Sequence, residues 1–252
     1  MANNGYKLKK TFVSLLTVVV LWHTLIFFNL IDSAFFPPPI LVIKNLIALF
    51  FEDNLLSQLL YSLKRLLIAS LIAVPLAILI ALLTTHDKKI DDSLNPIIAF
   101  TFPLPKVAIY PLLLLIFGIA DWSKITLISI GIFYIIYINF RIAIRRLLDS
   151  QACEITKIYK LSRIDYFWNF IIKGCQVELL TGFKLGFNYG LTLVVVSETS
   201  TSNNGLGYFI WKSWDQFKII NVYSGIFMLS IIGFIFYYIF ENLIERTRHK
   251  FF

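Results

Sequence analysis

The chain has 252 residues and a formal net charge of +8; 58% of its residues are apolar and 15% are charged. An average soluble domain has roughly 45–50% apolar and about 25% charged residues, so this composition excludes an ordinary water-soluble domain. Several stretches exceed the roughly 18 consecutive apolar residues that indicate a membrane helix. The sequence therefore predicts an all-α, polytopic integral membrane protein.

Hydrophobic segments predict a single transmembrane domain over residues 1–252. It has six spans, at residues 11–31, 60–84, 96–117, 124–142, 182–198 and 222–241. The first is too long for a signal peptide and lacks a small-residue cleavage site, so we expect it to be an anchor. Residues 35–54 contain three consecutive prolines, which cannot continue a helix, and are expected to form an interfacial helix. The third span should be broken or kinked, because it contains Pro103, Pro105 and Pro111.

Basic residues are distributed unequally between the predicted loops. With the amino terminus inside, sixteen of the 23 Lys and Arg residues fall in inner segments and six in outer ones, while Lys106 lies within a span. Cytoplasmic loops carry an excess of Lys and Arg, so both termini are expected in the cytoplasm. The bias, together with an anionic inner leaflet, accounts for the net charge without a nucleic-acid partner.

The loop between the fourth and fifth spans, residues 146–178, is charged and amphipathic. Its segment ACEITKIYKLSRIDYFWNF begins at Ala152, and Ser162 and Asp165 have the spacing of a capping box. We therefore expect two short helices that meet at a sharp corner near residues 160–162. Periodicity alone leaves two interpretations open: a linker lying on the membrane surface, or an element that docks a soluble partner and passes force to the spans.

The order of these features resembles the permease subunits of bacterial ABC importers of the nitrate, sulfonate and taurine type. Ser62-Leu63-Lys64-Arg65 resembles the Ser-Leu-x-Arg of that family, and residues 94–125 resemble its most characteristic segment, through Phe117-Gly118, Asp121, Ser123 and Lys124. Near the end, Glu198 and Gly205-Leu206-Gly207 match a Glu and a Gly-Leu-Gly element. The resemblance covers about residues 35–245. It implies the fold of a type I importer permease in the bacterial inner membrane.

The resemblance also implies that residues 146–178 form coupling helices that dock on an ATPase. Alignment through residues 179–190 places the family's glutamate on Glu154, its two alanines on Ile155 and Thr156, and its glycine on Lys160. Only the glutamate is kept; the family's two later prolines fall on Lys173 and Val177. These departures suggest adaptation to an equally divergent ATPase, pairing with a more standard permease, or lost coupling. The predicted coupling residues are Glu154, Ile155, Thr156, Lys160, Ser162 and Asp165.

Three polar residues within or beside the spans are candidates for the translocation path. Glu198 ends the fifth span, where an ionisable group should face a partner or water; an interfacial position is the alternative. Lys106 sits between prolines and would attract an anionic solute, or else snorkel or pair with a carboxylate. Asn188 shares a helix face with Lys184. Small residues four apart favour close helix packing, which we expect of Gly182, Gly186 and Gly190.

Motifs for catalysis are missing from the sequence. It has no Gly-x4-Gly-Lys-Ser/Thr phosphate loop, no Gly-x-Ser-x-Gly elbow and no His-Glu-x-x-His, and its three histidines are scattered. We therefore expect a non-enzymatic transport subunit with no cofactor and no metal. The resemblance implies two copies of an ATP-binding subunit, a second permease copy in a homodimer or heterodimer, and an extracytoplasmic solute-binding protein. The solute would be small and often anionic. A secondary transporter or channel is the alternative class.

Overall fold

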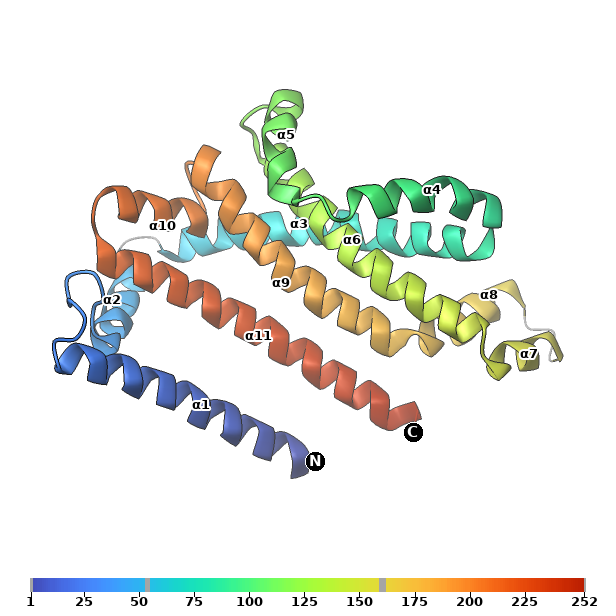
Figure 1. Ribbon diagram of the computed structural model, residues 1–252, viewed down its shortest axis with the longest axis horizontal. Coiled ribbons are helices and arrows are strands. Elements are labelled where there is room, and N and C mark those ends of the chain that lie inside the picture. Colours follow the sequence, from blue (N-terminus) through green and yellow to red (C-terminus); the bar gives the residue numbers. More distant parts are fainter. Residues whose placement is uncertain (1, 53–54, 159–161, 252) are drawn as a thin grey trace.

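The computed structural model describes residues 2–52, 55–158 and 162–251, and within these ranges the regular structure is entirely helical (Figure 1). Four long helices form the bundle: α3 (Leu55–His86), α6 (Asp121–Leu148), α9 (Gln176–Thr201) and α11 (Ile219–Phe251). They contain four of the expected spans and extend past the predicted limits at both ends. Each is long and apolar enough to cross a membrane.

Small residues bring the central helices together. Along α3, a stripe of alanines spaced four residues apart is fully buried against α6 and α9, at Ala69, Ala73, Ala77 and Ala81. Branched side chains of α6, among them Ile128, Ile132 and Ile136, fill the other side of this core. Side chains that recur every four residues share one helix face, so a single stripe of Cβ-only residues lets the long helices approach closely.

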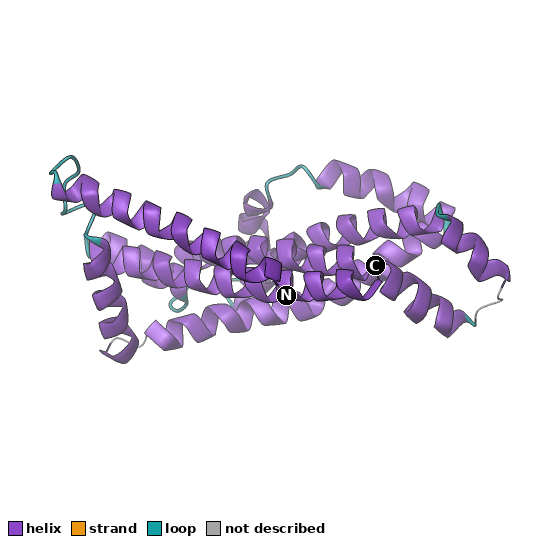
Figure 2. Ribbon diagram, turned by 90° about the horizontal axis from the view of Figure 1, so that it is seen from below, coloured by secondary structure: helices purple, strands orange, loops and turns teal. Residues whose placement is uncertain are grey.

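Two helices flank one end of the bundle. α1 (Ala2–Phe27) runs alongside α11, and α2 (Pro39–Glu52) lies across the ends of the long helices (Figures 1 and 2). α2 begins at the last of the three prolines, where a missing N–H does no harm. The strongly apolar part of α1 is confined to Leu16–Phe27, shorter than the other candidate spans, so the anchor over residues 11–31 stays a prediction.

The expected third span is split into two limbs. α4 (Lys88–Thr101) runs back along α3, and after a break the short helix η1 (Lys106–Ile109) leads into α5 (Tyr110–Phe117). The two limbs are bent by 96°, and α5 stands away from the bundle in Figure 1. The break contains Pro103 and Pro105. It occurs there because neither proline can donate the backbone hydrogen bond that would continue α4. The first limb begins earlier than expected, at Lys88.

The bundle has two distinct ends. At one end, called the α10 end, lie α2, the start of α3 and α10 (Leu206–Asp215). The opposite end, called the α7 end, carries α7 (Gln151–Ile158), α8 (Arg163–Asp165) and the π-helix η2 (Tyr166–Ile172). α1 and α11 both point their free ends towards the α7 end (Figure 1).

Candidate functional site

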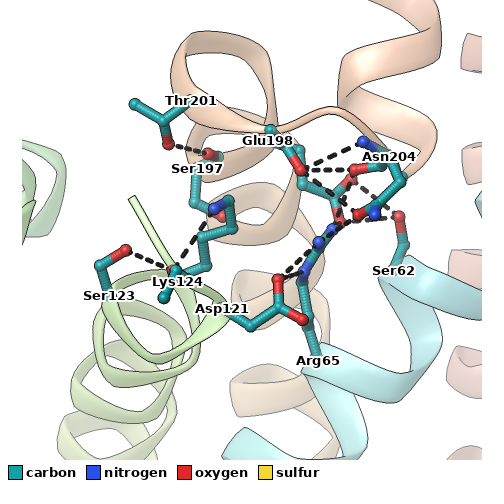
Figure 3. Close-up of polar contacts among 12 residues, drawn as sticks. Ser62, Arg65, Asp121, Ser123, Lys124, Ser197, Glu198, Thr201 and Asn204 are labelled. Carbon is teal, nitrogen blue, oxygen red and sulfur yellow. Dashed lines mark hydrogen bonds and ion pairs between the residues drawn. The ribbon is translucent and has the colours of Figure 1, made fainter. Parts of the chain in front are cut away.

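Charged and polar side chains from three helices and one loop converge at the α10 end of the bundle (Figure 3). We call this group the charge cluster: Ser62 and Arg65 of α3, Asp121 of α6, Glu198 of α9 and Asn204 of the following loop. Its members come from stretches far apart in the chain. Arg65 and Glu198 are buried almost completely, with side-chain exposures of 3% and 0%.

Arg65 is the centre of the charge cluster. Its Nη1 donates to Glu198 Oε1 at 2.6 Å and to the Asn204 carbonyl at 3.0 Å. Its Nε and Nη2 donate to Asp121 Oδ1 at 2.9 and 2.7 Å, and Nη2 also contacts the Asn204 side-chain oxygen. A guanidinium presents five N–H donors in a rigid plane, so one side chain can tie α3 to α6, α9 and the loop together.

The Glu198 carboxylate is satisfied from a second direction by Ser62 of α3 and by the start of α10. Ser62 Oγ lies 2.7 Å from Oε2, and the Gly207 N–H donates to Oε2 at 2.9 Å. The Leu206 N–H donates in turn to Ser62 Oγ at 2.8 Å. Gly205 has a φ of +109°, and a Cβ there would lie 2.3 Å from the Glu198 carboxyl carbon. The Gly-Leu-Gly element is therefore the backbone that wraps a buried carboxylate.

This arrangement favours holding the helices over binding a solute. A buried charge is tolerated when it is paired and its remaining hydrogen-bonding positions are filled, and the contacts above do this for Glu198. Asp121 is the one carboxylate of the charge cluster that reaches solvent, with a side-chain exposure of 48%. The charge cluster fixes the relative positions of α3, α6, α9 and α10 at this end.

Lys106 lies at the break in the third span, and its side chain is 4% exposed. Its ammonium donates to the carbonyls of Thr101 and Phe102 at 2.7 and 3.0 Å and lies 4.0 Å from the centre of the Tyr134 ring. These carbonyls lie at the carboxyl end of α4, where the helical backbone donors end at the break; the Thr101 carbonyl also accepts from the Leu104 N–H at 3.3 Å. The structure thus places this base as a cap on a helix carboxyl end, covered by an aromatic ring.

A cavity of about 460 Å³ lies beside the break, between α3, α6 and the two limbs of the third span. Its walls are mainly apolar and aromatic, with hydroxyl groups from Thr101, Thr126, Ser129 and Tyr134. The hydroxyls of Thr101 and Tyr134 are 2.6 Å apart. Lys106 is not among the lining residues. A mostly apolar hollow with a few polar groups has the composition of a small-molecule site.

The other two candidates for the path lie apart from this cavity. Glu198 belongs to the charge cluster, and Asn188, further along α9, faces α11, with its Oδ1 4.0 Å from the position of a Cβ on Gly233. The structure therefore does not bring Lys106, Glu198 and Asn188 together at one site. Lys184, on the same face as Asn188, pairs with Glu241 of α11 at 2.8 Å.

The glycine stripe of α9 faces α6. A Cβ on Gly182 or Gly186 would lie 3.3 Å from Asn139 or Ile136, and one on Gly190 would lie 2.8 Å from Leu66 of α3. Contacts below 3.0 Å require a neighbour to move, so among these three glycines Gly190 has the least room for a side chain, between Leu66 of α3 and Ile132 of α6. The sequence did not indicate which helix the stripe would meet.

The loop at the α7 end forms short helices on either side of residues 159–161. Ser162 precedes α8, and its Oγ accepts from the Asp165 N–H at 3.1 Å and lies 2.6 Å from Asp165 Oδ2. Glu154 is exposed on α7, and Thr156 donates to the Cys153 carbonyl at 2.7 Å. Lys160 and the side chain of Ile155 lie outside the described residues. The predicted capping contact is therefore present at the start of α8, whereas the corner expected near residues 160–162 lies largely outside the described residues.

Several charged groups at the α7 end are more accessible than Arg65 and Glu198. Asp91 of α4 pairs with Arg141 and Arg145 of α6 at 2.5 and 2.6 Å. The exposed bases Lys88, Lys89 and Arg146 lie at the same end. Within the described ranges, no group of three or more His, Cys, Asp or Glu side chains is placed to hold a metal ion.

Reasoning from the sequence gave Arg65 no partner and did not single out Asn204. Both belong to the charge cluster, and the signal that pointed to it was the resemblance of Ser62, Arg65, Asp121, Glu198 and the Gly-Leu-Gly element to family motifs. Tyr110 was also missed. Its hydroxyl donates to the Ser197 carbonyl at 2.9 Å, joining the start of α5 to α9.

Comparison with known proteins identifies the family. The sequence profile described as "Binding-protein-dependent transport system inner membrane component" matches residues 73–249. The taurine transport system permease protein of Escherichia coli K12 is 29% identical over 229 residues, covering 88% of this chain and 82% of that protein.

Two further relatives have different solutes in their names. The nitrate import permease protein of Synechococcus elongatus is 28% identical over 210 residues, covering 78% of this chain and 75% of the relative. The formylaminopyrimidine transport permease protein of Halalkalibacterium halodurans is 25% identical over 197 residues, covering 78% of each. The chain belongs to the family of binding-protein-dependent inner membrane components, the permease subunits of ABC importers of the nitrate, sulfonate and taurine type.

Proposed function

We propose that this chain is the permease subunit of an ATP-driven importer and forms the translocation path for a small anionic solute. The observation that carries the proposal is the broken third span. Residues 102–105 are non-helical and exposed on the surface of this chain, within a segment expected to cross the membrane. Irregular backbone at that depth is tolerated only where protein covers it or where it lines a cavity.

A second permease copy is the simplest cover for the break. The face around it is strongly apolar: Phe100 is 77%, Leu115 84% and Ile116 70% exposed. Two copies related by a two-fold axis would bury these surfaces on each other. The solute path would then run between the two breaks, next to the hydroxyl-lined cavity.

The energy source would be a separate ATP-binding subunit, because the sequence has no phosphate loop. Its docking surface would be residues 146–178, where α7 and α8 project from the α7 end and Ile164 and Trp168 are 73% and 58% exposed. The binding protein would meet the α10 end, where Trp211 and Trp214 of α10 are about half exposed, at 50% and 51%.

The α7 end and both termini would then lie in the cytoplasm, and the two cysteines report on this orientation. Cys153 in α7 is half-buried, whereas burial raises the pKa of the Cys175 thiol to about 12. The Cys175 side chain is buried, so a maleimide does not reach it. A membrane-impermeant maleimide should label Cys153 in inverted vesicles and not in right-side-out spheroplasts, and Cys153→Ser should abolish the signal. Labelling of Cys153 in spheroplasts would show that the α7 end lies outside the cell.

Taurine, sulfonates, nitrate and formylaminopyrimidine are the solutes to test first, because the relatives' names contain them. The chain should be reconstituted in liposomes with the ATP-binding and solute-binding proteins encoded beside it. We expect uptake of at least one of these solutes that requires ATP and stops when the phosphate-loop lysine of the ATP-binding subunit is replaced. Uptake that persists without ATP would favour a secondary transporter or channel.

A further inference from the structure

A second cavity lies at the α7 end, between the end of α3 and the start of η2. Its volume is about 600 Å³. Leu82, Leu83, Phe167 and Ile171 form apolar walls, Tyr166 adds an aromatic surface, and the charged or ionisable residues of the lining are His86 and Arg163. Among the described residues, no acidic side chain lines it. The cavity therefore combines an apolar interior with a basic rim.

The rim is available to a ligand. Arg163 is exposed, and its guanidinium makes no hydrogen bond or ion pair with any other described residue. The acids nearest in sequence are engaged in local contacts: Asp165 accepts from Ser162 and Asn169, and Asp87 accepts from the Lys89 N–H. Lys89 and its neighbour Lys88 are exposed in the first turn of α4, adding positive charge next to His86.

An apolar track leads from the cavity along α3. Leu79 and Leu83, four residues apart on one face, are 52% and 38% exposed. In a membrane this face meets acyl chains. A ligand with an anionic head at Arg163 and a hydrocarbon tail along these leucines would match both parts of the surface.

We propose that this cavity binds an anionic phospholipid of the inner leaflet, with its phosphate at Arg163 and His86 and an acyl chain along α3. Basic pockets beside transmembrane helices at the cytoplasmic face suit anionic lipid headgroups. The orientation assumed here rests on the proposed function; the composition of the cavity does not. Because α3 and η2 form facing walls of the cavity, the lipid would also hold η2 against α3, making the coupling loop responsive to lipid composition.

Lipid retention by the purified chain tests the proposal without an ATPase or a transported solute. Native mass spectrometry would compare phosphatidylglycerol with phosphatidylcholine for the wild type, for Arg163→Gln and for Lys173→Gln. Lys173 is the matched control, because it is an exposed base directly after η2 that does not line the cavity. A basic residue near an anionic lipid surface contributes roughly a fivefold preference.

We expect wild type and Lys173→Gln to retain phosphatidylglycerol over phosphatidylcholine, and Arg163→Gln to lose about fivefold of that preference. Free glycerol phosphate should not displace the lipid, because it lacks the acyl chain. Equal retention of both lipids by the wild type, or equal loss in both variants, would overturn the proposal. Unchanged lipid retention in Arg163→Gln with weakened binding of the ATP-binding subunit would assign the cavity to that subunit instead. Failure of transport with intact lipid selectivity would count against the proposed function alone.

Discussion

The two ends of the bundle satisfy their charges in opposite ways. At the α10 end, Arg65 and Glu198 are sealed from solvent and each makes several contacts with its neighbours. At the α7 end, Glu154, Arg163 and Asp165 are exposed, and the capping contact of Ser162 is local to its own helix. The difference teaches that Arg65 and Glu198 are satisfied within a single chain, whereas several charged groups at the α7 end are left accessible to solvent.

Breaking the charge cluster should produce the largest loss of stability. Glu198→Ala leaves the Arg65 guanidinium buried beside an empty position, and removing one partner of a buried pair typically destabilises by about 3–5 kcal/mol. Asp121→Ala should have a smaller effect, because the Asp121 carboxylate is 48% exposed and water can replace part of what is lost. Thermal unfolding in detergent measures both. Equal and small decreases in the unfolding temperature of both variants would show that the charge cluster does not hold the α10 end together.

Gly205 offers a second way to test the charge cluster. Gly205→Ala introduces both an unfavourable positive φ and a Cβ 2.3 Å from the Glu198 carboxyl carbon. Gly118 is a matched control, because its φ is +69° but no atom lies within 4 Å of a Cβ there. Gly118→Ala should lose about 1–3 kcal/mol from backbone strain alone, and Gly205→Ala clearly more. If the two variants unfold at the same temperature, the wrapping of Glu198 contributes nothing.

A substitution at Lys106 can distinguish a role as a helix cap from a role in attracting an anionic solute. Lys106→Met removes the donors to two α4 carbonyls and the contact with Tyr134, and should destabilise by about 1–2 kcal/mol. Lys212→Met is the control, since Lys212 is exposed and lies 5.4 Å from the Tyr208 ring. If Lys106 caps α4, the variant should be less stable and keep the solute preference of the wild type. Unchanged stability together with lost uptake of anions would instead place Lys106 in the translocation path.

The α7 end should respond to substitution in partner binding more than in stability. Ser162→Ala removes a helix cap worth about 1 kcal/mol from an exposed element, so global unfolding should change little while copurification of the ATP-binding subunit weakens. Ser93→Ala, an exposed helix serine that bonds only to Lys89 of its own helix, is the control. Glu154→Ala should behave like Ser162→Ala, and Asp215→Ala at the α10 end like the control. Loss of global stability in Ser162→Ala would contradict this division.

Much of the fold could be predicted because apolar segments, proline and capping residues act locally. The long helices, the position of the break and the Ser162 cap depend on residues within a few positions of one another. The charge cluster could not be predicted from such rules, because Arg65, Asp121, Glu198 and Asn204 meet only through tertiary packing. The position of Lys106 was missed for a related reason: the carbonyls of Thr101 and Phe102 become visible as its partners only when the geometry of the break is known.

ATP hydrolysis by the reconstituted complex tests the central claim most directly, that this chain couples an outer binding event to a separate ATPase. The chain alone, the chain with the ATP-binding subunit, and the full set with solute-loaded binding protein would be compared in liposomes. The account predicts no hydrolysis by the chain alone and stimulation by the loaded binding protein. A well-folded complex whose hydrolysis ignores the binding protein would contradict it, leaving the altered residues between Glu154 and Val177 as the place where coupling was lost.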